Sequence, residues 1–321
     1  MKPKQKLEWK NETIITEFLL LGFGDLRELQ ILLFMVFLMI YITTMAGNLL
    51  IVFLVVTDQH LHTPMYFFLG NLSCLETCYS STILPRMLAS FLTGSQRVSV
   101  NGCIVQLWPF VFLAVTECYL LAAMSYDRYI AICRPLHYLV LMNFKVCLQL
   151  VAGSWIGSFL IDTILLLFIL QVSYCGHNVI DHFFCDFLPM MDLACGDVDQ
   201  VKLVSSVLTS ISTLPPFLLT IASYVYIIAA ILGIPSTTGR QKAFSTCSSH
   251  LIVVTIFYGT LIIVYLLPDT KELQDLNKIF SLFYTILTPL VNPLIYSLRN
   301  KEVKEALRRA VTKCANCIRI P

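Results

Sequence analysis

The sequence predicts an all-α membrane protein: a bundle of seven transmembrane helices followed by a short amphipathic helix on the cytoplasmic side. Three observations lead to this prediction. The 321 residues are 57% hydrophobic and 13% charged, with a mean hydropathy of +0.76, which leaves too little charge to cover a soluble domain of this length. The apolar residues gather into seven long segments, and most Lys and Arg residues of the connecting loops fall on one side of them.

The seven segments are each long enough to cross roughly 30 Å of hydrocarbon, which takes about 20 helical residues. The predicted spans are 30–56, 65–87, 103–126, 146–171, 203–233, 244–267 and 277–298. The second span and the last two contain polar residues, which are costly in lipid unless they face the interior of the bundle. These spans are therefore expected to carry functional groups.

The chain is predicted to form one transmembrane domain, because it has no internal repeat and no low-complexity segment. We assign residues 1–29 to an extracellular N-terminus, 30–298 to the seven helices, and 299–321 to a cytoplasmic helix and tail. The N-terminal segment lacks the apolar core of a cleaved signal peptide. The first span is therefore expected to act as an uncleaved signal anchor.

The orientation follows from the basic residues near the spans, which favour the cytoplasmic side. One set of loops and the adjoining tail hold Arg128, Arg134, Lys145, Arg240, Lys242, Arg299, Lys301, Lys304, Arg308, Arg309, Lys313 and Arg319. The opposite loops hold only Arg97, Lys202, Lys271 and Lys278, among several acids. Asn11 begins an Asn-Glu-Thr sequon, a glycosylation signal that suits an extracellular N-terminus. A plasma-membrane protein with its N-terminus outside is expected.

Residues 301–311 are predicted to form an amphipathic helix. Val303, Ala306, Leu307, Ala310 and Val311 recur at the spacing of one helix face, and basic residues flank them. Such a helix lies on the inner leaflet of a membrane. Cys314 and Cys317 beyond it are either palmitoylation sites or free thiols.

Four motifs identify the chain with a known family. They are LHTPMY at 61–66, MSYDRYIAIC at 124–133, KAFSTCSSHL at 242–251 and PLVNPLIY at 289–296, in this order along nearly the whole chain. Together with Gly47 and Asn48 in the first span, they resemble the motifs of vertebrate odorant receptors, within the rhodopsin-like G-protein-coupled receptors. The motif set looks like the larger, tetrapod-type class of these receptors.

The resemblance implies a receptor that binds a small volatile odorant and activates a stimulatory olfactory G protein, which raises cAMP. The implied activation residues are Asp127, Arg128, Tyr129, Tyr224, Asn292, Pro293 and Tyr296. In this scheme Asp127 holds Arg128 at rest and releases it when the helices part. The alternatives are a cationic anchor at Arg128 and a merely structural kink at Pro293, which removes a backbone hydrogen bond.

Four polar residues inside the predicted bundle form a candidate sodium site by the same resemblance: Asn48, Glu76, Glu117 and Asn292. Glu76 departs from the family pattern, which has an aspartate at this position. Two carboxyl groups in a region of low dielectric constant are not both comfortably ionised unless a cation joins them. A bound sodium ion, a shared proton and a structural hydrogen-bond network are the three interpretations. No other cofactor is expected.

The chain has twelve cysteines. Cys175, Cys185 and Cys195 crowd one polar loop, and Cys103 opens the third span, so that these four allow three pairings. The family pattern implies a Cys103–Cys185 bridge, which leaves Cys175 and Cys195 for a second one.

A ligand pocket is expected in the outer half of the bundle, where residues on three spans recur at helical spacing. The candidates are Val111, Ala114, Val115, Cys118, Ser205, Leu208, Thr209, Ser212, Tyr258, Leu261, Ile262 and Tyr265. Such a pocket is mainly apolar with a few hydroxyl groups. The recurring residues of each span, taken alone, are also typical of core packing. Asp181 and Asp269 are either solvated loop acids or acids that favour an amine ligand. Phe110, at the position of the aminergic aspartate, disfavours an amine.

Two other classes of membrane protein fit the sequence less well. A channel or transporter would also use Glu76 and Glu117, but transporters usually contain internal repeats, which this chain lacks. A membrane enzyme would need a catalytic motif. The six histidines are scattered over different segments without a zinc-binding spacing, so we predict that the chain is not an enzyme.

Overall fold

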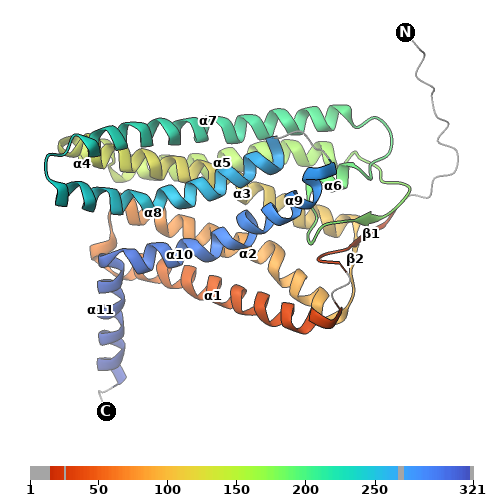
Figure 1. The fold of residues 1–321 in the computed structure, drawn as a ribbon, viewed down its shortest axis with the longest axis horizontal. Coiled ribbons are helices and arrows are strands. Elements are labelled where there is room, and N and C mark those ends of the chain that lie inside the picture. Colours follow the sequence, from red (N-terminus) through yellow and green to blue (C-terminus); the bar gives the residue numbers. More distant parts are fainter. Residues whose placement is uncertain (1–14, 25–26, 267–270, 319–321) are drawn as a thin grey trace, which may run out of the picture.

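Seven long helical segments lie side by side in the structure, a computed structural model that describes residues 15–24, 27–266 and 271–318 (Figure 1). The first six are α1 (Gln30–Thr57), α2 (Pro64–Thr93), α3 (Val100–Cys133), α5 (Phe144–Ile169), α7 (Asp199–Leu232) and α8 (Thr237–Leu261). The seventh consists of α9 (Lys271–Leu282), a π-helical turn η5 (Phe283–Leu287) and α10 (Thr288–Arg299). A second π-helical turn, η4 (Ile262–Leu266), continues α8.

Short helical pieces join the long ones, and α11 (Lys301–Ile318) follows the bundle. The connecting pieces are η1 (Arg27–Leu29), η2 (Gln59–Leu61), η3 (Pro135–His137), α4 (Tyr138–Leu141) and α6 (Phe187–Met191). Figure 1 shows α11 turning away from the bundle at a steep angle to α10. The helix predicted at residues 301–311 is therefore present and extends further.

Five described segments are long and apolar enough to cross a membrane: α1, α3, α5, α7 and a stretch from Leu276 to Ile295. Segments α2 and α8 lie where the second and sixth spans were predicted, but polar residues lower their mean hydropathy. The stretch His250–Tyr265 within α8 and η4 is apolar but shorter. The outward side chains of the long helices are apolar, as in Ile31 of α1, Leu167 of α5 and Leu218 of α7, which are each more than half exposed.

Local signals in the sequence determine where the helices begin and end. Ser99, Asn143 and Ser236 accept a backbone N–H hydrogen bond at the starts of α3, α5 and α8. Pro64 occupies the first turn of α2, where its missing N–H costs nothing. Helix α2 ends at Gly94, whose φ of 68° is in the left-handed region that favours glycine.

Helix α3 is the centre of the bundle, because it packs against α2, α5, α7 and α8. In its most apolar 18-residue stretch 67% of the residues are buried, compared with 22% for α1. Helix α1 instead lies at the edge, against α2 and α10. Gly47 on α1 permits the second contact, since a Cβ atom there would lie 3.0 Å from the Cβ of Pro293.

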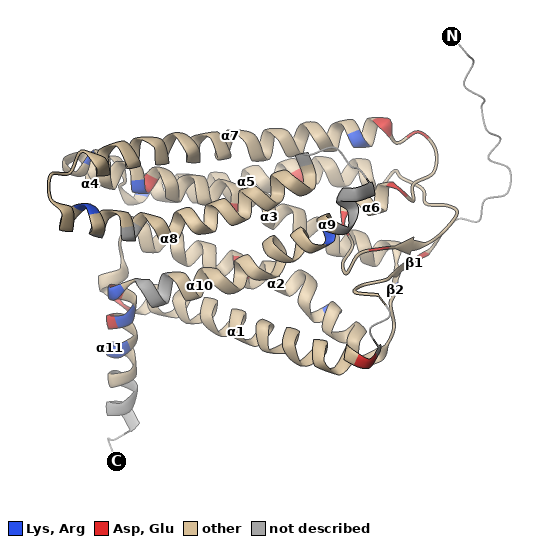
Figure 2. Ribbon diagram, viewed as in Figure 1, with Lys and Arg blue, Asp and Glu red and all other residues tan. Residues whose placement is uncertain are grey.

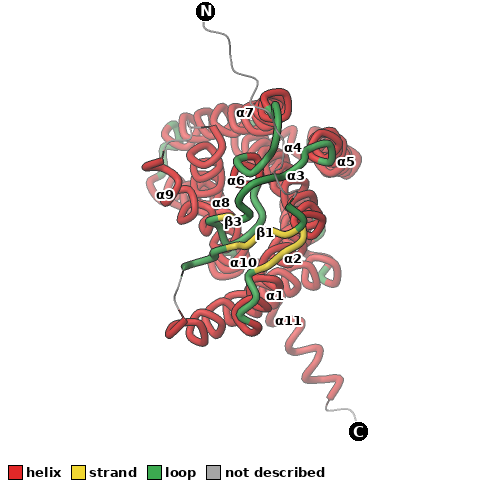
Figure 3. Tube along the Cα trace, turned by 90° about the vertical axis from the view of Figure 1, so that its right-hand side faces the viewer, coloured by secondary structure: helices red, strands yellow, loops and turns green. Residues whose placement is uncertain are grey.

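A small sheet covers one end of the bundle, which the all-α prediction did not include. Its strands are β1 (Glu17–Leu20), β2 (Arg97–Ser99) and β3 (Val179–Ile180), in the order β2-β1-β3. Strand β1 is antiparallel to β2 and parallel to β3. Figure 3 shows the strands and the loop before α7 lying across the helix ends. We call this the sheet end.

Helix α11 is attached to the opposite end of the bundle by polar contacts. Arg309 Nε donates to Asp58 Oδ2 at 2.8 Å, and Asn300 Oδ1 accepts from Tyr66 at 3.0 Å and from the first backbone N–H groups of α11. Figure 2 shows that charged residues concentrate at the two ends of the bundle and along α11. Few lie between, as expected for helices surrounded by hydrocarbon.

Candidate functional site

A cavity of about 70 Å³ lies between α3, α5, α7 and α8, in the half of the bundle nearer the sheet end. The residues around it are Phe110, Val111, Ala114, Val115, Cys118, Leu165, Asp186, Phe187, Ser205, Thr209, Ser212, Thr213, Leu261, Tyr265 and Tyr284. Most of this lining is apolar, and the hydroxyl groups come mainly from one wall, α7. The chemistry of this lining suits a small, mainly apolar molecule held by a few directed hydrogen bonds.

Tyr258 closes the cavity from below. Its hydroxyl group donates to the backbone oxygen of Cys118 at 2.6 Å, and its ring lies 5.2 Å from that of Phe217, between centroids. The hydrogen bond is buried and joins α8 to α3, and the ring contact joins α8 to α7. Tyr258 thereby supports the cavity without lining it.

A hydrogen-bonded cluster closes the cavity from above. Tyr265 donates to Asp186 Oδ1 at 2.9 Å, and its hydroxyl group lies 3.0 Å from that of Tyr284, which donates to Ser281. Asp186 also accepts from the N–H of Phe187 at the start of α6. Burial raises the pKa of Asp186 to about 6, although the hydrogen bonds from Tyr265 and Phe187 act in the opposite direction.

The two tyrosines of this cluster both lie in π-helical turns. Tyr265 belongs to η4 and Tyr284 to η5, so each helix gains one extra residue per turn at the same level of the bundle. Turns of this kind are rare and are often found at functional sites. Here they rotate the two hydroxyl groups toward each other and toward the loop that carries Asp186.

Glu76, Glu117 and Asn292 come together in the middle of the bundle, with Asn48 on the adjacent α1, and all four are almost entirely buried. Asn292 donates to Glu76 Oε1, and the carboxyl groups of Glu76 and Glu117 interact with each other. Asn48 donates to the backbone oxygens of Thr44 and Pro289. The oxygens Asn48 Oδ1, Glu76 Oε2, Glu117 Oε1 and Oε2, and Asn292 Oδ1 have no hydrogen-bond partner. Such a set of buried oxygens fits a hard cation.

At the end of the bundle that carries α11, Asp127 accepts from Tyr138 at 2.9 Å. Tyr138 of α4 is thus one partner of Asp127 among the described residues. The positive charge of Arg128 also lies close enough to interact favourably with Asp127. The resting pair implied by the resemblance stays a prediction.

The other predicted activation residues are on neighbouring helices. The Tyr224 hydroxyl lies 2.6 Å from His250 Nδ1, which links α7 to α8. The Tyr129 ring is 5.8 Å from that of Tyr226, between centroids, and joins α3 to α7. Pro293 lies within α10, whereas the side chain of Tyr296 lies outside the described residues.

Two disulfides connect the loop before α7, in the pairing that the resemblance implies. Cys103 at the start of α3 is bonded to Cys185, and Cys175 to Cys195. The first bridge ties the loop to the bundle directly beside Asp186. The loop therefore becomes part of the wall of the cavity.

A profile of olfactory receptors matches residues 37–314 of the chain. The chain belongs to the olfactory receptor family. Olfactory receptor 6B1 of Homo sapiens is 48% identical over 303 residues, which are 94% of this chain and 97% of that receptor. Olfactory receptor 6Z7 of Mus musculus is 48% identical over 308 residues, 96% of this chain and 99% of its own. This olfactory receptor is thus a rhodopsin-like G-protein-coupled receptor, and its family is one of signalling proteins.

Most of the pocket residues expected from the sequence line the cavity of this olfactory receptor. They are Val111, Ala114, Val115, Cys118, Ser205, Thr209, Ser212, Leu261 and Tyr265. Leu208, Tyr258 and Ile262 do not. Leu208 lies beside the wall on α7, and Ile262 begins the π-helical turn, which changes the helical register from which it was predicted.

Sequence reasoning missed six lining residues of the receptor: Phe110, Leu165, Asp186, Phe187, Thr213 and Tyr284. Asp186 and Phe187 belong to the connection between α5 and α7, where the five residues of α6 are too few for a periodic pattern. The signal that could have found them is the neighbouring Cys185, because its bridge to Cys103 brings the loop to the top of α3. Asn11, Asp269 and the side chains of Cys314 and Cys317 lie outside the described residues.

Proposed function

We propose that this olfactory receptor binds a small volatile odorant in the cavity between α3, α5, α7 and α8, and activates a stimulatory olfactory G protein that raises cAMP. The observation that carries the proposal is the cavity itself. It is bordered by α3, α5, α7 and α8, is lined mainly by apolar side chains, and has hydroxyl groups on one wall. Because a ligand of this size has few atoms, we expect micromolar or weaker affinity.

The proposal includes seven membrane spans in the plasma membrane with the N-terminus outside. Helix α2 and the α8–η4 segment supply the two spans beyond the five apolar ones, since their polar groups point into the bundle, as Glu76 and His250 do. The basic residues on α11 suit the cytoplasmic side. The sheet end is then extracellular, where disulfides form and where Asn11 would carry a glycan.

The amphipathic character of α11 supports membrane lipid as a further partner. Val303 and Ala306 are buried against the bundle, while Val311 is exposed and available to acyl chains. Basic residues along the helix suit anionic headgroups of the inner leaflet. Palmitoylation of Cys314 or Cys317 would strengthen this attachment.

Activation in this proposal is a shift between two populations of the bundle, with the ligand binding better to the state that is open on the cytoplasmic side. The contacts that must change lie around Arg128: the Asp127–Tyr138 hydrogen bond and the Tyr224–His250 contact. Pro293 gives α10 a point at which it can bend, because it lacks the backbone N–H of a regular helix.

The cluster of Asn48, Glu76, Glu117 and Asn292 would hold a sodium ion. Its support is the set of buried oxygens without hydrogen-bond partners. The ion would neutralise two neighbouring carboxylates and link α1, α2, α3 and α10. A proton shared by Glu76 and Glu117 is the alternative. Agonist potency should depend on the sodium concentration if a sodium ion is bound, and should not if a proton is shared.

The first experiment measures cAMP in cells that express this receptor and the olfactory G protein, across volatile alcohols, aldehydes, acids, amines and esters. We expect a dose-dependent response that Arg128→Ala abolishes while surface expression stays at the wild-type level. The reason is that Arg128 lies on the face presented to the G protein. Intact signalling by Arg128→Ala would contradict its role in coupling.

A pair of matched variants tests the position of the pocket. Ala114→Leu adds volume inside the cavity and is expected to raise the half-maximal agonist concentration about tenfold. Ala222→Leu makes the same change on the exposed side of α7 and should leave the response unchanged. Equal potency of both variants would show that the odorant binds elsewhere.

A further inference from the structure

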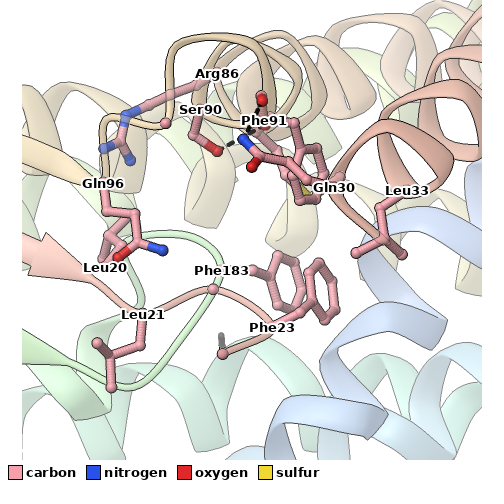
Figure 4. Close-up of a pocket in the computed structure, with 14 residues that line it drawn as sticks. Leu20, Leu21, Phe23, Gln30, Leu33, Arg86, Ser90, Phe91, Gln96 and Phe183 are labelled. Carbon is pink, nitrogen blue, oxygen red and sulfur yellow. Dashed lines mark hydrogen bonds between the residues drawn. The ribbon is translucent and has the colours of Figure 1, made fainter. Parts of the chain in front are cut away.

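A second and larger cavity lies at the sheet end, between α1, α2 and the segment that follows β1. Its volume is about 300 Å³, and it shares no lining residue with the odorant cavity. Figure 4 shows its lining residues, including Gln30 and Leu33 from α1, Arg86 and Phe91 from α2, and Phe23 from the N-terminal segment. A volume of this size is within the range of ligand-binding cavities.

Arg86 places a positive charge on the wall of this cavity. Its side chain is half-buried, and its guanidinium group carries five N–H donors. The described contacts are weak: Gln106 Oε1 at 3.4 Å and Cys185 Sγ at 3.9 Å. Gln106 Oε1 is also already the acceptor for the backbone N–H of Cys185, at 3.1 Å.

No described carboxylate lies within 4.0 Å of the Arg86 guanidinium. The carboxylates near the sheet end have other partners: Glu17 is near Arg97, and Asp181 is paired with Lys278. A half-buried cation without a counter-charge is costly, and such groups in membrane helices are usually paired or functional. As far as the described part of the chain goes, the guanidinium donors therefore remain available for an anion in the cavity.

The rest of the lining is suited to an apolar chain. The Phe23 ring stacks on those of Phe183 and Phe91, at centroid distances of 5.5 and 6.3 Å, and Leu33 lies beside them. In Figure 4, Arg86 and Gln96 lie on one side of the cavity, and the aromatic rings lie apart from them. The cavity thus has a polar cationic part and an aromatic part.

We propose that this cavity binds an amphiphile in which an anionic oxygen head group, a carboxylate or a phosphate, contacts Arg86 and an apolar chain lies against Phe23, Phe91 and Phe183. Two sources supply this chemistry: a free fatty acid or an anionic lipid of the surrounding membrane. The site is separate from the odorant cavity, so its occupancy does not depend on the proposed function.

The test uses the purified full-length receptor in nanodiscs of zwitterionic lipid, with octanoate as the probe. We expect octanoate to raise the melting temperature by roughly 2–4 °C at saturation. The matched uncharged ligand, 1-octanol, should have a much smaller effect, because it lacks the carboxylate. Equal stabilisation by the two ligands would overturn the proposal.

Two variants locate the effect. Arg86→Gln removes the charge and should abolish the octanoate shift, whereas Arg97→Gln, which removes an exposed charge outside the cavity, should preserve it. Ser90→Phe fills the cavity and keeps Arg86, so it decides the question if Arg86→Gln does not fold. A full octanoate shift in either Arg86→Gln or Ser90→Phe would contradict the assignment.

A final experiment distinguishes a free fatty acid from an anionic membrane lipid as the occupant of the cavity. Nanodiscs that contain phosphatidylglycerol supply an anionic headgroup at high local concentration. Loss of the octanoate shift in these nanodiscs, with the wild-type receptor, would identify the lipid as the occupant. An unchanged shift would identify the free carboxylate, because the lipid then fails to reach Arg86.

Discussion

Asp186 connects the loop before α7 with the proposed odorant cavity. Its carboxyl group is buried, it accepts hydrogen bonds from Tyr265 and Phe187, and it lines the cavity. Because burial raises its pKa to about 6, it changes protonation within the range of mucosal and endosomal pH. A protonated carboxyl group can donate a hydrogen bond to a ligand, whereas the ionised form can only accept one.

Agonist potency is therefore expected to depend on pH. A carbonyl odorant should be roughly two- to tenfold more potent at pH 5.5 than at pH 7.5, the effect of one hydrogen bond. The native state binds this proton more tightly than the unfolded chain between about pH 4 and 6, so the stability from this group falls as pH rises through that range. Asp186→Asn should remove the dependence of potency in cAMP dose–response curves.

The control for this experiment is Asp181→Asn. Asp181 is in the same loop, but its side chain is 62% exposed and it is paired with Lys278. That variant should keep the wild-type pH dependence. A pH dependence that survives in Asp186→Asn would assign the titration to another group.

At the residue scale, the sequence predicts those pocket residues that recur at helical spacing on one face of a helix. The stripe of Val111, Ala114, Val115 and Cys118 was found because one face of α3 repeats every three to four residues. The hydrogen bond from Tyr138 to Asp127 was missed, since Tyr138 approaches Asp127 only through the fold of the loop between α3 and α5.

Helix α11 is attached to the bundle in part through Asp58. Asp58 lies between α1 and α2, and the hydrogen bond from Arg309 holds its pKa well below the usual range. A carboxyl group whose pKa is lowered by folding adds to the stability of the folded state at every pH above its pKa in the unfolded chain. This added stability is lost only in acid. The contact between Asp58 and α11 is therefore independent of pH near neutrality.

Asp58→Asn is expected to loosen α11. Loss of the partly buried ion pair should speed backbone hydrogen exchange in α11 about fivefold, measured by mass spectrometry on the receptor in nanodiscs. Glu305→Gln is the matched control. It also contacts Arg309, at 3.9 Å, but its side chain is 65% exposed, compared with 12% for Asp58. Similar exchange in the two variants would contradict the role of Asp58.

At the element scale, the predicted spans are mostly shorter than the helices. The prediction ended the third span at residue 126, whereas α3 continues to Cys133. Hydropathy detects only the part of a helix that lies in hydrocarbon. The ends of a helix that extend into water contain polar residues and are therefore missed. The strands were not predicted, because two to four residues are too few for an alternating pattern.

At the scale of the whole molecule, the sheet end of the receptor is a cap that covalent bonds and hydrogen bonds hold together. Two disulfides and the three-stranded sheet connect the N-terminal segment, the start of α3 and the long loop. The bridge from Cys103 to Cys185 closes the longer loop, with a separation of 82 residues, compared with 20 for the other. It is also the bridge that holds Asp186 over the odorant cavity.

Cys103→Ser should prevent delivery of the receptor to the cell surface. The expected result is at least a tenfold decrease in the ratio of surface to total receptor, measured by flow cytometry, because the loss of such a bridge costs about 2–4 kcal/mol. Cys74→Ser removes an exposed free thiol and should leave the ratio unchanged. Normal delivery of Cys103→Ser would show that the cap forms without this bridge.

The order of the strands has a consequence for biosynthesis. The central strand β1 emerges from the ribosome first, but its parallel partner lies about 160 residues later, where Leu20 pairs with Ile180. At 5–20 residues per second, this interval is roughly 8–30 seconds. In the orientation proposed above, β1 lies in the lumen during this interval and can pair only with β2 until β3 has been made. It is then open to glycosyltransferases and chaperones, and the cap closes only after the residues of β3, which follow α5, have been translated.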